Sequence, residues 1–245
     1  MSLALLRSRL ADLVAPPPVA ADLLPTGVAA LDAALGGGLP RGRLTEIAGP
    51  LGSGTATLAR RLVTGLVARG LGVAYVDAAR TLAPADWAHL ARGHLRMVRP
   101  PEAARGAWCA DVLLRSGAFV LVVLDGAPPL TRPQALRLVG LAREKDAAFV
   151  LIGQDRPSAV SGAVRVALRR RWGGKAVRPD GAIQILVERG GNRELIEIPG
   201  MLPEAKRLGV HPAGPDRRGV GRGRGKRWKG ARNGGRRLAS GEASC

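Results

Sequence analysis

The sequence predicts an α/β fold with a mainly parallel central sheet, helices on both faces of that sheet and an antiparallel C-terminal extension. Two observations predict it. Short apolar segments such as "VAYVDA" and "FVLVVLD" alternate with segments of helical periodicity, which is the pattern of a parallel sheet covered on both faces. After about residue 154 the helical segments stop and three more strand patterns follow, which predict a meander that extends one edge of the sheet.

The N-terminal elements come first. Four leucines at helical spacing predict a helix over residues 2–14, and "APPPVAAD" then forms a stiff linker. This helix is expected to pack on the chain's own core or to bind a partner. A short helix over 27–35 and a turn-rich segment, "GGGLPRG", precede the first strand of the sheet, "LTEIA" at 44–48.

The rest of the fold alternates between the two periodicities. Leu58, Leu62 and Leu66 form one stripe of a helix that Gly70 ends, and Pro84 stands in the first turn of another helix. Together, the expected helices cover 55–69, 84–93, 101–117 and 132–145, and the expected strands cover 73–78, 95–98, 119–125, 148–154, 162–172, 182–190 and 194–200.

Three parts follow from composition: an N-terminal helix with its proline-rich linker (1–21), a core domain (22–207) and a basic tail (208–245). Residues 214–245 contain nine glycines and ten Arg or Lys against two acidic residues, so we expect this segment to be disordered. The formal charge of the whole chain is +19, which favours an acidic partner such as nucleic acid.

Several kinds of protein are excluded by the same composition. The two cysteines, Cys109 and Cys245, form neither a disulfide framework nor a metal-binding pattern, so we expect a reducing compartment and no metal. The N-terminus is interrupted by charges and is not typical of a signal peptide. No apolar run is long enough to span a membrane, so we expect a cytoplasmic protein without membrane contact.

The stretch "GPLGSGTA" follows the first sheet strand and opens a helix, as a phosphate-binding loop does. Its lysine position holds Thr55, and the position of the metal-binding hydroxyl holds Ala56. Arg60 and Arg61 are the nearest cations, a turn or more into the helix. We favour a strand-to-helix turn that has lost phosphate chemistry over a working site, because phosphoryl transfer needs a positioned cation and a metal. The residues of this vestigial loop are Gly49, Pro50, Leu51, Gly52, Ser53, Gly54, Thr55 and Ala56.

The stretch "LPTGVAALDAALGGGLPRGRLTEIAGPLGSGTATL" resembles the RecA recombinase family over its full length, and the likeness continues through "AYVDAARTLAP" and "AFVLIGQDR". The resemblance implies a RecA-like P-loop core over roughly residues 22–200. It places the Walker B aspartate at Asp125, the glutamine that couples nucleotide state to the DNA loops at Gln154, and the catalytic glutamate at Ala79. Without a hydroxyl at Ala56, we favour a polar strand-end cap as the role of Asp125.

The loss of cation, hydroxyl and general base together is similar to the ImuA-type accessory proteins of error-prone translesion synthesis. That likeness implies a scaffold without catalytic residues, no required cofactor, and ATP binding without turnover as the remaining option. It also implies a Y-family-like polymerase subunit, or RecA itself, as the protein partner. Two alternatives stay open: a DNA-dependent ATPase of the recombinase type, and a regulatory protein of the SulA type without DNA contact.

Two basic segments are candidate contacts for single-stranded DNA without sequence preference. In "ALRRRWGGKAVRP", Arg169 and Arg171 share one face of a strand and Trp172 could stack on a base; a solvated edge strand guarded by charge is an equal alternative. In the tail, glycine-spaced cations around a tryptophan favour nucleic-acid contact over a solubilising role. The tail candidates are Arg217, Arg218, Arg222, Arg224, Lys226, Arg227, Trp228 and Lys229.

Overall fold

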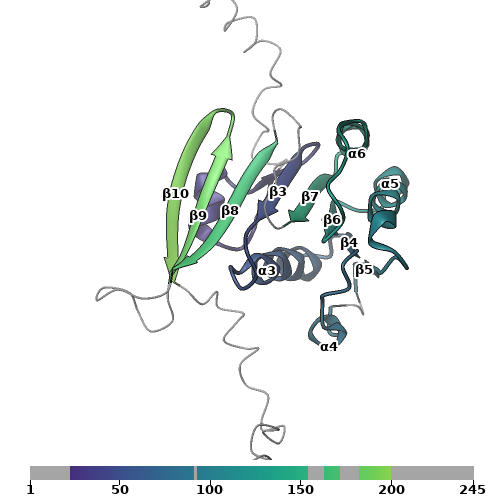
Figure 1. Ribbon diagram of the computed structural model, residues 1–245, viewed down its shortest axis with the longest axis horizontal. Helices are drawn as coiled ribbons and strands as arrows, with labels where there is room; N and C mark the ends of the chain where they lie inside the picture. Colours follow the sequence, from purple (N-terminus) through teal and green to yellow (C-terminus); the bar gives the residue numbers. More distant parts are fainter. Residues whose placement is uncertain (1–22, 91–92, 154–162, 172–181, 200–245) are drawn as a thin grey trace, which may run out of the picture. The chain divides into compact units, whose positions relative to one another are not determined.

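A mixed eight-stranded sheet forms the centre of the core domain in the computed structural model, which describes residues 23–90, 93–153, 163–171 and 182–199. The strand order is β10-β9-β8-β3-β7-β6-β4-β5 (Figure 1). The strands are β3 (Leu44–Ala48), β4 (Val73–Asp77), β5 (Leu95–Val98), β6 (Leu121–Asp125), β7 (Ala148–Gly153), β8 (Val164–Arg171), β9 (Ala182–Arg189) and β10 (Asn192–Pro199). The helices are α2 (Ala29–Ala34), α3 (Thr55–Ala68), α4 (Pro84–Trp87), η2 (Ala103–Arg105), α5 (Gly106–Ser116) and α6 (Arg132–Glu144).

The predicted α/β class is confirmed. Strands β3, β4, β5, β6 and β7 are mutually parallel, and β4 lies beside β6 with Val73 opposite Leu121 and Asp77 opposite Asp125. Both of these strands are almost wholly buried, as continuous apolar runs require in a sheet covered on both faces. Their carboxyl ends meet at one edge of the sheet, next to the loop that opens α3.

The predicted antiparallel extension is confirmed, because β8 pairs antiparallel with β9 and β9 pairs antiparallel with β10. The other side of β8 pairs in parallel with β3, with Thr45 opposite Val164. The sequence prediction did not specify this second pairing. A strand's own sequence carries its burial pattern but not the direction of a neighbour that is distant along the chain.

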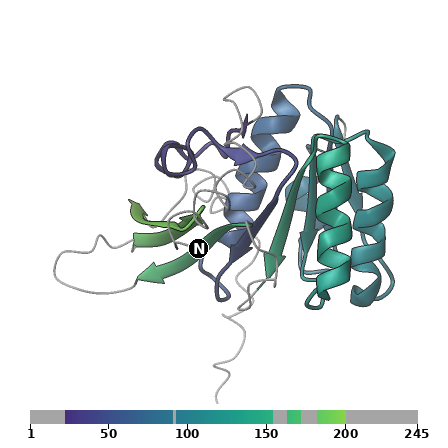
Figure 2. The ribbon, with the colours of Figure 1, turned by 90° about the horizontal axis from the view of Figure 1, so that it is seen from above.

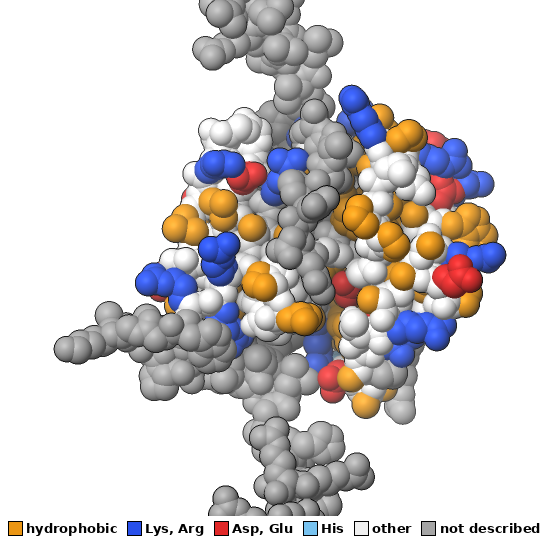
Figure 3. All heavy atoms as spheres, viewed as in Figure 1, with side chains coloured by type: hydrophobic (Ala, Val, Ile, Leu, Met, Phe, Trp, Pro, Cys, Tyr) orange, Lys and Arg blue, Asp and Glu red, His pale blue; other side chains and the backbone are white. Residues whose placement is uncertain are grey.

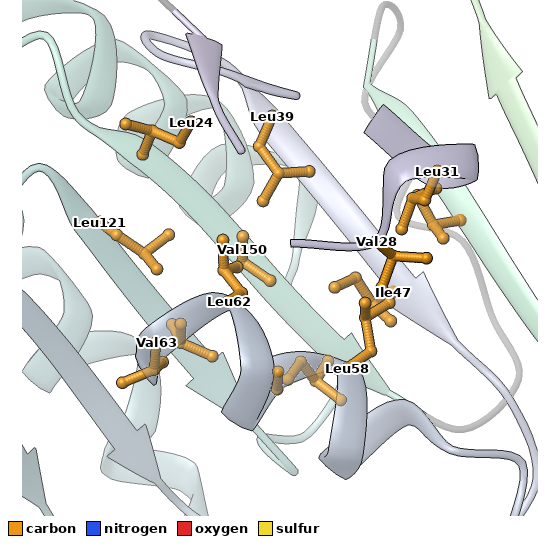
Figure 4. Packing of buried hydrophobic residues seen from close by; sticks show 14 of the residues in the cluster. Leu24, Val28, Leu31, Leu39, Ile47, Leu58, Leu62, Val63, Leu121 and Val150 are labelled. Carbon is orange, nitrogen blue, oxygen red and sulfur yellow. The ribbon is translucent and has the colours of Figure 1, made fainter. Parts of the chain in front are cut away.

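Helices cover the two faces of the parallel strands unequally (Figure 2). The apolar stripe of α3, formed by Leu58, Leu62 and Leu66, packs in one core cluster with Ile47 and Val150 (Figure 4). On the opposite face α5 and α6 pack over β4, β6 and β7, in a second cluster built around Phe149. Burial of each such leucine contributes about 1.5–3 kcal/mol relative to exposure.

Two local elements also differ from expectation. The helix expected over 84–93 ends at Trp87, and an i→i+3 bond from Leu90 N–H to the Trp87 carbonyl follows it. Trp87 is buried with its ring 5.1 Å from that of Tyr75, so packing of this turn replaces helical continuation. Residues 37–40 include a strand, β2 (Leu39–Pro40), which pairs with β1 (Leu23–Leu24). The expected helix over 2–14 lies outside the described residues.

The extension β8–β10 is covered on one face only, as far as the described residues show. Its inward side chains, such as Val166, Ile185 and Ile198, are buried in the same core cluster as α3. The alternate side chains face away from that core and are half-buried or exposed, as Leu186 and Leu195 are. We call this second side the open face of the extension.

Candidate phosphate-binding site

The loop between β3 and α3 has the backbone shape that its glycines predict. Gly52 and Gly54 have φ angles of +80° and +105°, in the left-handed region that favours glycine. Gly54 is the N-cap of α3, and the helix begins at Thr55. The loop therefore presents the N-terminus of a fourteen-residue helix at the carboxyl end of a central strand.

Gly49 is required by close packing rather than by its dihedral angles. A Cβ atom at this position would lie 2.5 Å from Ser53 Oγ and 2.6 Å from the carbonyl oxygen of Leu168. The Ser53 N–H donates to the Pro50 carbonyl at 3.0 Å, which closes the loop on itself. Ser53 is 1% exposed and its Oγ has no hydrogen-bond partner among the described residues.

The side chains at the chemical positions of the loop cannot supply the usual groups. Thr55 is half-buried at the first helical position and carries no charge, and Ala56 is exposed and carries no oxygen. The Arg61 Nε donates to the Gly27 carbonyl at 2.6 Å and so ties α3 to the segment before α2. Leu51, at the tip of the loop, is 89% exposed.

Asp125 stands at the end of β6, where the resemblance places the Walker B aspartate. The Tyr75 hydroxyl donates a 2.7 Å hydrogen bond to Asp125 Oδ2 from the neighbouring strand. Burial raises the pKa of Asp125 above its usual range, while the Tyr75 hydrogen bond lowers it and the charge of Asp77 raises it. Burial, with Asp125 beside it, also raises the pKa of Tyr75 well above the ordinary value. This partner was missed by sequence reasoning, although Tyr75 is the only tyrosine in the chain and lies in an apolar strand.

Asp77, at the end of β4, is held by hydrogen bonds from the turn that follows β4 and by a salt bridge to Arg99. Its side chain is fully buried and accepts hydrogen bonds from the N–H groups of Thr81 and Leu82. Arg99 forms a salt bridge to it at 2.8 Å. These bonds hold the turn that carries Ala79, which is exposed at the carboxyl edge of the sheet. A Cβ on Gly126, the residue after Asp125, would lie 2.4 Å from the Ala79 Cβ, so the expected general-base position does lie beside the expected metal-ligand position.

The nucleic-acid candidates are only partly placed. Arg169 and Arg171 are both exposed and share the open face, as predicted from strand alternation. Acidic side chains accompany them: Arg171 lies 3.9 Å from Glu197. Figure 3 shows basic, acidic and hydrophobic side chains interspersed over the extension. Gln154, Trp172, Lys175, Arg178 and the tail residues Arg217, Arg218, Arg222, Arg224, Lys226, Arg227, Trp228 and Lys229 lie outside the described residues.

A row of alternating charges crosses the open face. Glu46 on β3 pairs with Arg165 on β8 at 3.1 Å, Arg165 lies 3.9 Å from Glu188 on β9, and Glu188 pairs with Arg193 on β10 at 2.6 Å. These residues are direct cross-strand neighbours in the sheet register. The row borders a groove of about 490 Å³ that Ala48, Ala167 and Leu195 also line. Such a mixed surface is less selective for phosphate than a purely basic one.

Comparison with known proteins shows the family to which the chain belongs. The sequence model described as the RecA N-terminal domain matches residues 10–140, more than half of the chain. The chain belongs to the RecA family. "Protein RecA" of Bifidobacterium breve is 41% identical over 112 residues, which are 44% of this chain and 29% of that protein. "Protein RecA" of Kineococcus radiotolerans is 40% identical over 125 residues, which are 50% of this chain and 35% of that protein.

The match therefore spans about a third of the length of these RecA proteins. A solved structure, described as the RadB recombinase, superimposes with a TM-score of 0.53 and 23% identity, covering 71% of this chain and 94% of that one. This likeness shows the RecA-like fold. Across the described parts of the chain, no helix is long and apolar enough to cross a membrane. Within the same residues no cluster of His, Cys, Asp or Glu could hold a metal ion.

Proposed function

We propose that this RecA-family chain is an accessory protein of DNA repair and damage-induced mutagenesis that does not hydrolyse ATP. Its role would be to bind single-stranded DNA and a protein partner, either a Y-family-like polymerase subunit or RecA, during translesion synthesis. The observation that carries the proposal is the contrast within one site: the loop keeps its backbone cradle, while Thr55, Ala56 and Ala79 stand where a cation, a metal-binding hydroxyl and a general base are needed.

The geometry around Asp125 supports the same proposal. One carboxylate oxygen accepts the Tyr75 hydrogen bond, and burial favours the protonated form of this group. A metal ligand in a nucleotide site has to be ionised and open toward the phosphates. Arg61, one of the two nearest cations, donates from its Nε to the Gly27 carbonyl. Asp125 and Arg61 therefore each have a structural use.

Nucleotide could still bind in the cradle without turnover. The loop keeps a helix N-terminus and left-handed glycines, which favour an anion by themselves. Such binding would lack the lysine and the metal, so we expect it to be weak. The scaffold role needs no nucleotide chemistry, and ATP is therefore not a required cofactor of the proposed function.

The proposal is tested by complementation in the cells that encode the protein. Deleting its gene is expected to lower damage-induced mutation frequency, and the Asp125→Asn variant is expected to restore it fully, because no hydrolysis step is needed. Ala79→Glu serves as a matched control, since it restores one missing group at an exposed position and should neither help nor harm.

The recombinase-type alternative gives the opposite pattern in the same cells. Deletion would lower homologous recombination, and Asp125→Asn would fail to restore it even though the protein accumulates normally. A regulatory role of the SulA type would leave mutation frequency unchanged on deletion. Copurification from DNA-damaged cells, with and without the deletion of residues 214–245, would then identify which protein binds the core domain.

A further inference from the structure

β10 is one of the two edge strands of the sheet, and its outward backbone groups have no strand beside them among the described residues. The strand has eight residues, Asn192–Pro199, and pairs with β9 along its whole length without a bulge. Long regular edges invite another strand, and proteins usually block them with bulges or cover them. Leu195, in the middle of this edge strand, is 63% exposed.

The hairpin fixes which backbone groups point outward. Gly190 and Gly191, with φ angles of +57° and +88°, form the two-residue loop that joins Arg189 to its partner Asn192. In such a turn the N–H of the fourth residue bonds back to the first, so the Asn192 N–H faces β9. Alternation along the strand then points the backbone groups of Arg193, Leu195 and Glu197 away from β9. Pro199 follows in the same series, and its missing N–H costs nothing at an outward position.

We propose that β10 pairs antiparallel with β10 of a second copy of this chain, with Leu195 opposite Leu195 on the two-fold axis. In this register Arg193 of each copy lies opposite Glu197 of the other, and all three pairs are of the type that exchanges two backbone hydrogen bonds. The two sheets become one continuous sheet through the dimer. The interface is isologous, as two-fold symmetry requires.

Charge selects this register over its neighbours. Hydrogen-bonding geometry allows only shifts by an even number of residues, because a shift by one would oppose inward and outward groups. A shift by two residues places Arg193 or Glu197 opposite Leu195 and pairs neither charge with its opposite. A shift by four residues places Arg193 opposite Arg193 or Glu197 opposite Glu197. Like charges directly opposite each other are destabilising, whereas opposite charges and apolar pairs stabilise a ladder. Only the register centred on Leu195 places both Arg193 and Glu197 opposite a residue of the opposite charge.

The row of charges on the open face continues through this register. In one copy the signs alternate from Glu46 through Arg165 and Glu188 to Arg193, each within 4 Å of the next. Glu197 of the second copy would be the next member and would lie beside Arg193. Leu195 would gain its counterpart at the same time and lose most of its exposure to water. A second copy therefore fits the edge in backbone bonding, in charge and in apolar contact.

The oligomeric state of the full chain over a concentration series tests the proposal. Light scattering after size exclusion is expected to give twice the monomer mass, and Leu195→Lys is expected to weaken dimerisation about tenfold or more. Leu136→Lys is the matched control, because Leu136 is 51% exposed on α6 and should leave the dimer unchanged. A monomer at every concentration, or a dimer that Leu195→Lys does not weaken, would overturn the proposal.

Cross-linking tests the register. With Cys245 replaced by serine and the native Cys109 buried, a Leu195→Cys variant should form a disulfide-linked dimer, because hydrogen-bonded partners lie about 5.5 Å apart between Cα atoms. Glu194→Cys, one residue away, should not cross-link to itself. Efficient self-linking of Arg193→Cys or Glu197→Cys instead would reject this register.

Hydrogen exchange adds an independent readout: the Leu195 amide should lose protection on dilution while the Ile196 amide stays protected. Protection of Leu195 in a monomer would show that the chain's own segments cover the edge.

Discussion

The Tyr75 hydroxyl donates a 2.7 Å hydrogen bond to Asp125 Oδ2 between two neighbouring buried strands. The carboxylate that the family resemblance assigns to metal binding is therefore held by a neutral donor from the sheet itself. The arrangement fits a polar strand-end cap, and it makes predictions about stability that do not depend on any nucleotide.

Removing the hydroxyl should destabilise the fold. Tyr75→Phe leaves a buried acceptor without its donor, so we expect the free energy of unfolding to fall by about 1–3 kcal/mol. The hydrogen bond from Tyr75 lowers the pKa of Asp125, so the pKa should rise further when this bond is removed. Urea denaturation followed by circular dichroism measures the first effect. Unchanged stability would mean that water replaces the tyrosine and that Asp125 is less enclosed than described.

Neutralising the carboxylate should have the opposite effect. The pKa of Asp125 is higher in the folded than in the unfolded chain, so the folded state binds more protons between these two values. Stability is therefore lost as pH rises through the folded pKa and stays reduced above it. Asp125→Asn removes this loss, and each pKa unit of the shift corresponds to about 1.4 kcal/mol gained at neutral pH. Denaturation curves from pH 4 to pH 8 should show the gap between variant and parent widening with pH. A variant less stable than its parent at pH 8 would contradict this account.

Asp111 should respond to pH with the opposite sign. It accepts hydrogen bonds from Arg137 on α6, which joins the two helices, and from Arg115 on its own helix α5. The Arg137 bond lowers the pKa of Asp111 more than any other cause. A lowered pKa gives stability that is present above the unfolded value and is lost as pH falls through the folded value. Asp111→Asn should therefore cost about 1–3 kcal/mol at pH 7 and little at a pH below both values. An equal cost at both pH values would assign the effect to packing instead.

The two glycines before and within α3 offer a matched pair. Gly49→Ala places a Cβ within 2.6 Å of Ser53 Oγ and the Leu168 carbonyl, so we expect a loss of about 1–3 kcal/mol from overpacking. Gly65→Ala lies in the same helix that the loop opens and meets nothing within 4 Å. It should stabilise the protein by about 0.5–1 kcal/mol. Thermal unfolding of both variants measures the difference, and equal melting temperatures would show that the loop is less tightly closed than described.

The basic tail should supply much of the affinity for single-stranded DNA. If about five of its charges meet phosphates, log K should change with log salt by a slope of about −3 to −4, and Trp228 should add ~1–3 kcal/mol if it stacks on a base. Deleting residues 214–245 should weaken binding and flatten the slope while the domain stays folded. Fluorescence titration against an oligonucleotide at several salt concentrations measures both. Equal affinity and slope with and without the tail would leave the basic segment over residues 169–178, with Arg169, Arg171 and Trp172, as the remaining candidate.

Local patterns in the sequence predicted most of the elements but not their partners. Continuous apolar runs predicted β4 and β6 within a residue or two, because burial on both faces leaves a strong signal. The parallel pairing of β8 with β3 was not predicted, since it joins residues more than a hundred positions apart. A helix beginning at Pro84 was predicted, but its end at Trp87, where that side chain contacts Tyr75, was not.

For the candidate site, too, single residues were predicted but their contacts were not. The prediction that a cation, a hydroxyl and a general base are missing came from single positions, because Thr55, Ala56 and Ala79 can be identified without knowing their neighbours. The contacts that use the remaining groups were not visible. The bond from Arg61 to Gly27 and the bond from Tyr75 to Asp125 each join elements that come together only in the folded sheet.

Phosphate release from ATP tests the central claim most directly, measured at high protein concentration with magnesium, with and without single-stranded DNA, beside a RecA protein as positive control. The parent chain, Asp125→Asn and Thr55→Lys are all expected to match the protein-free blank, because a single lysine restores neither the metal-binding hydroxyl nor the general base. Sustained release by the parent chain that Asp125→Asn abolishes would contradict the account and would identify the protein as an active ATPase.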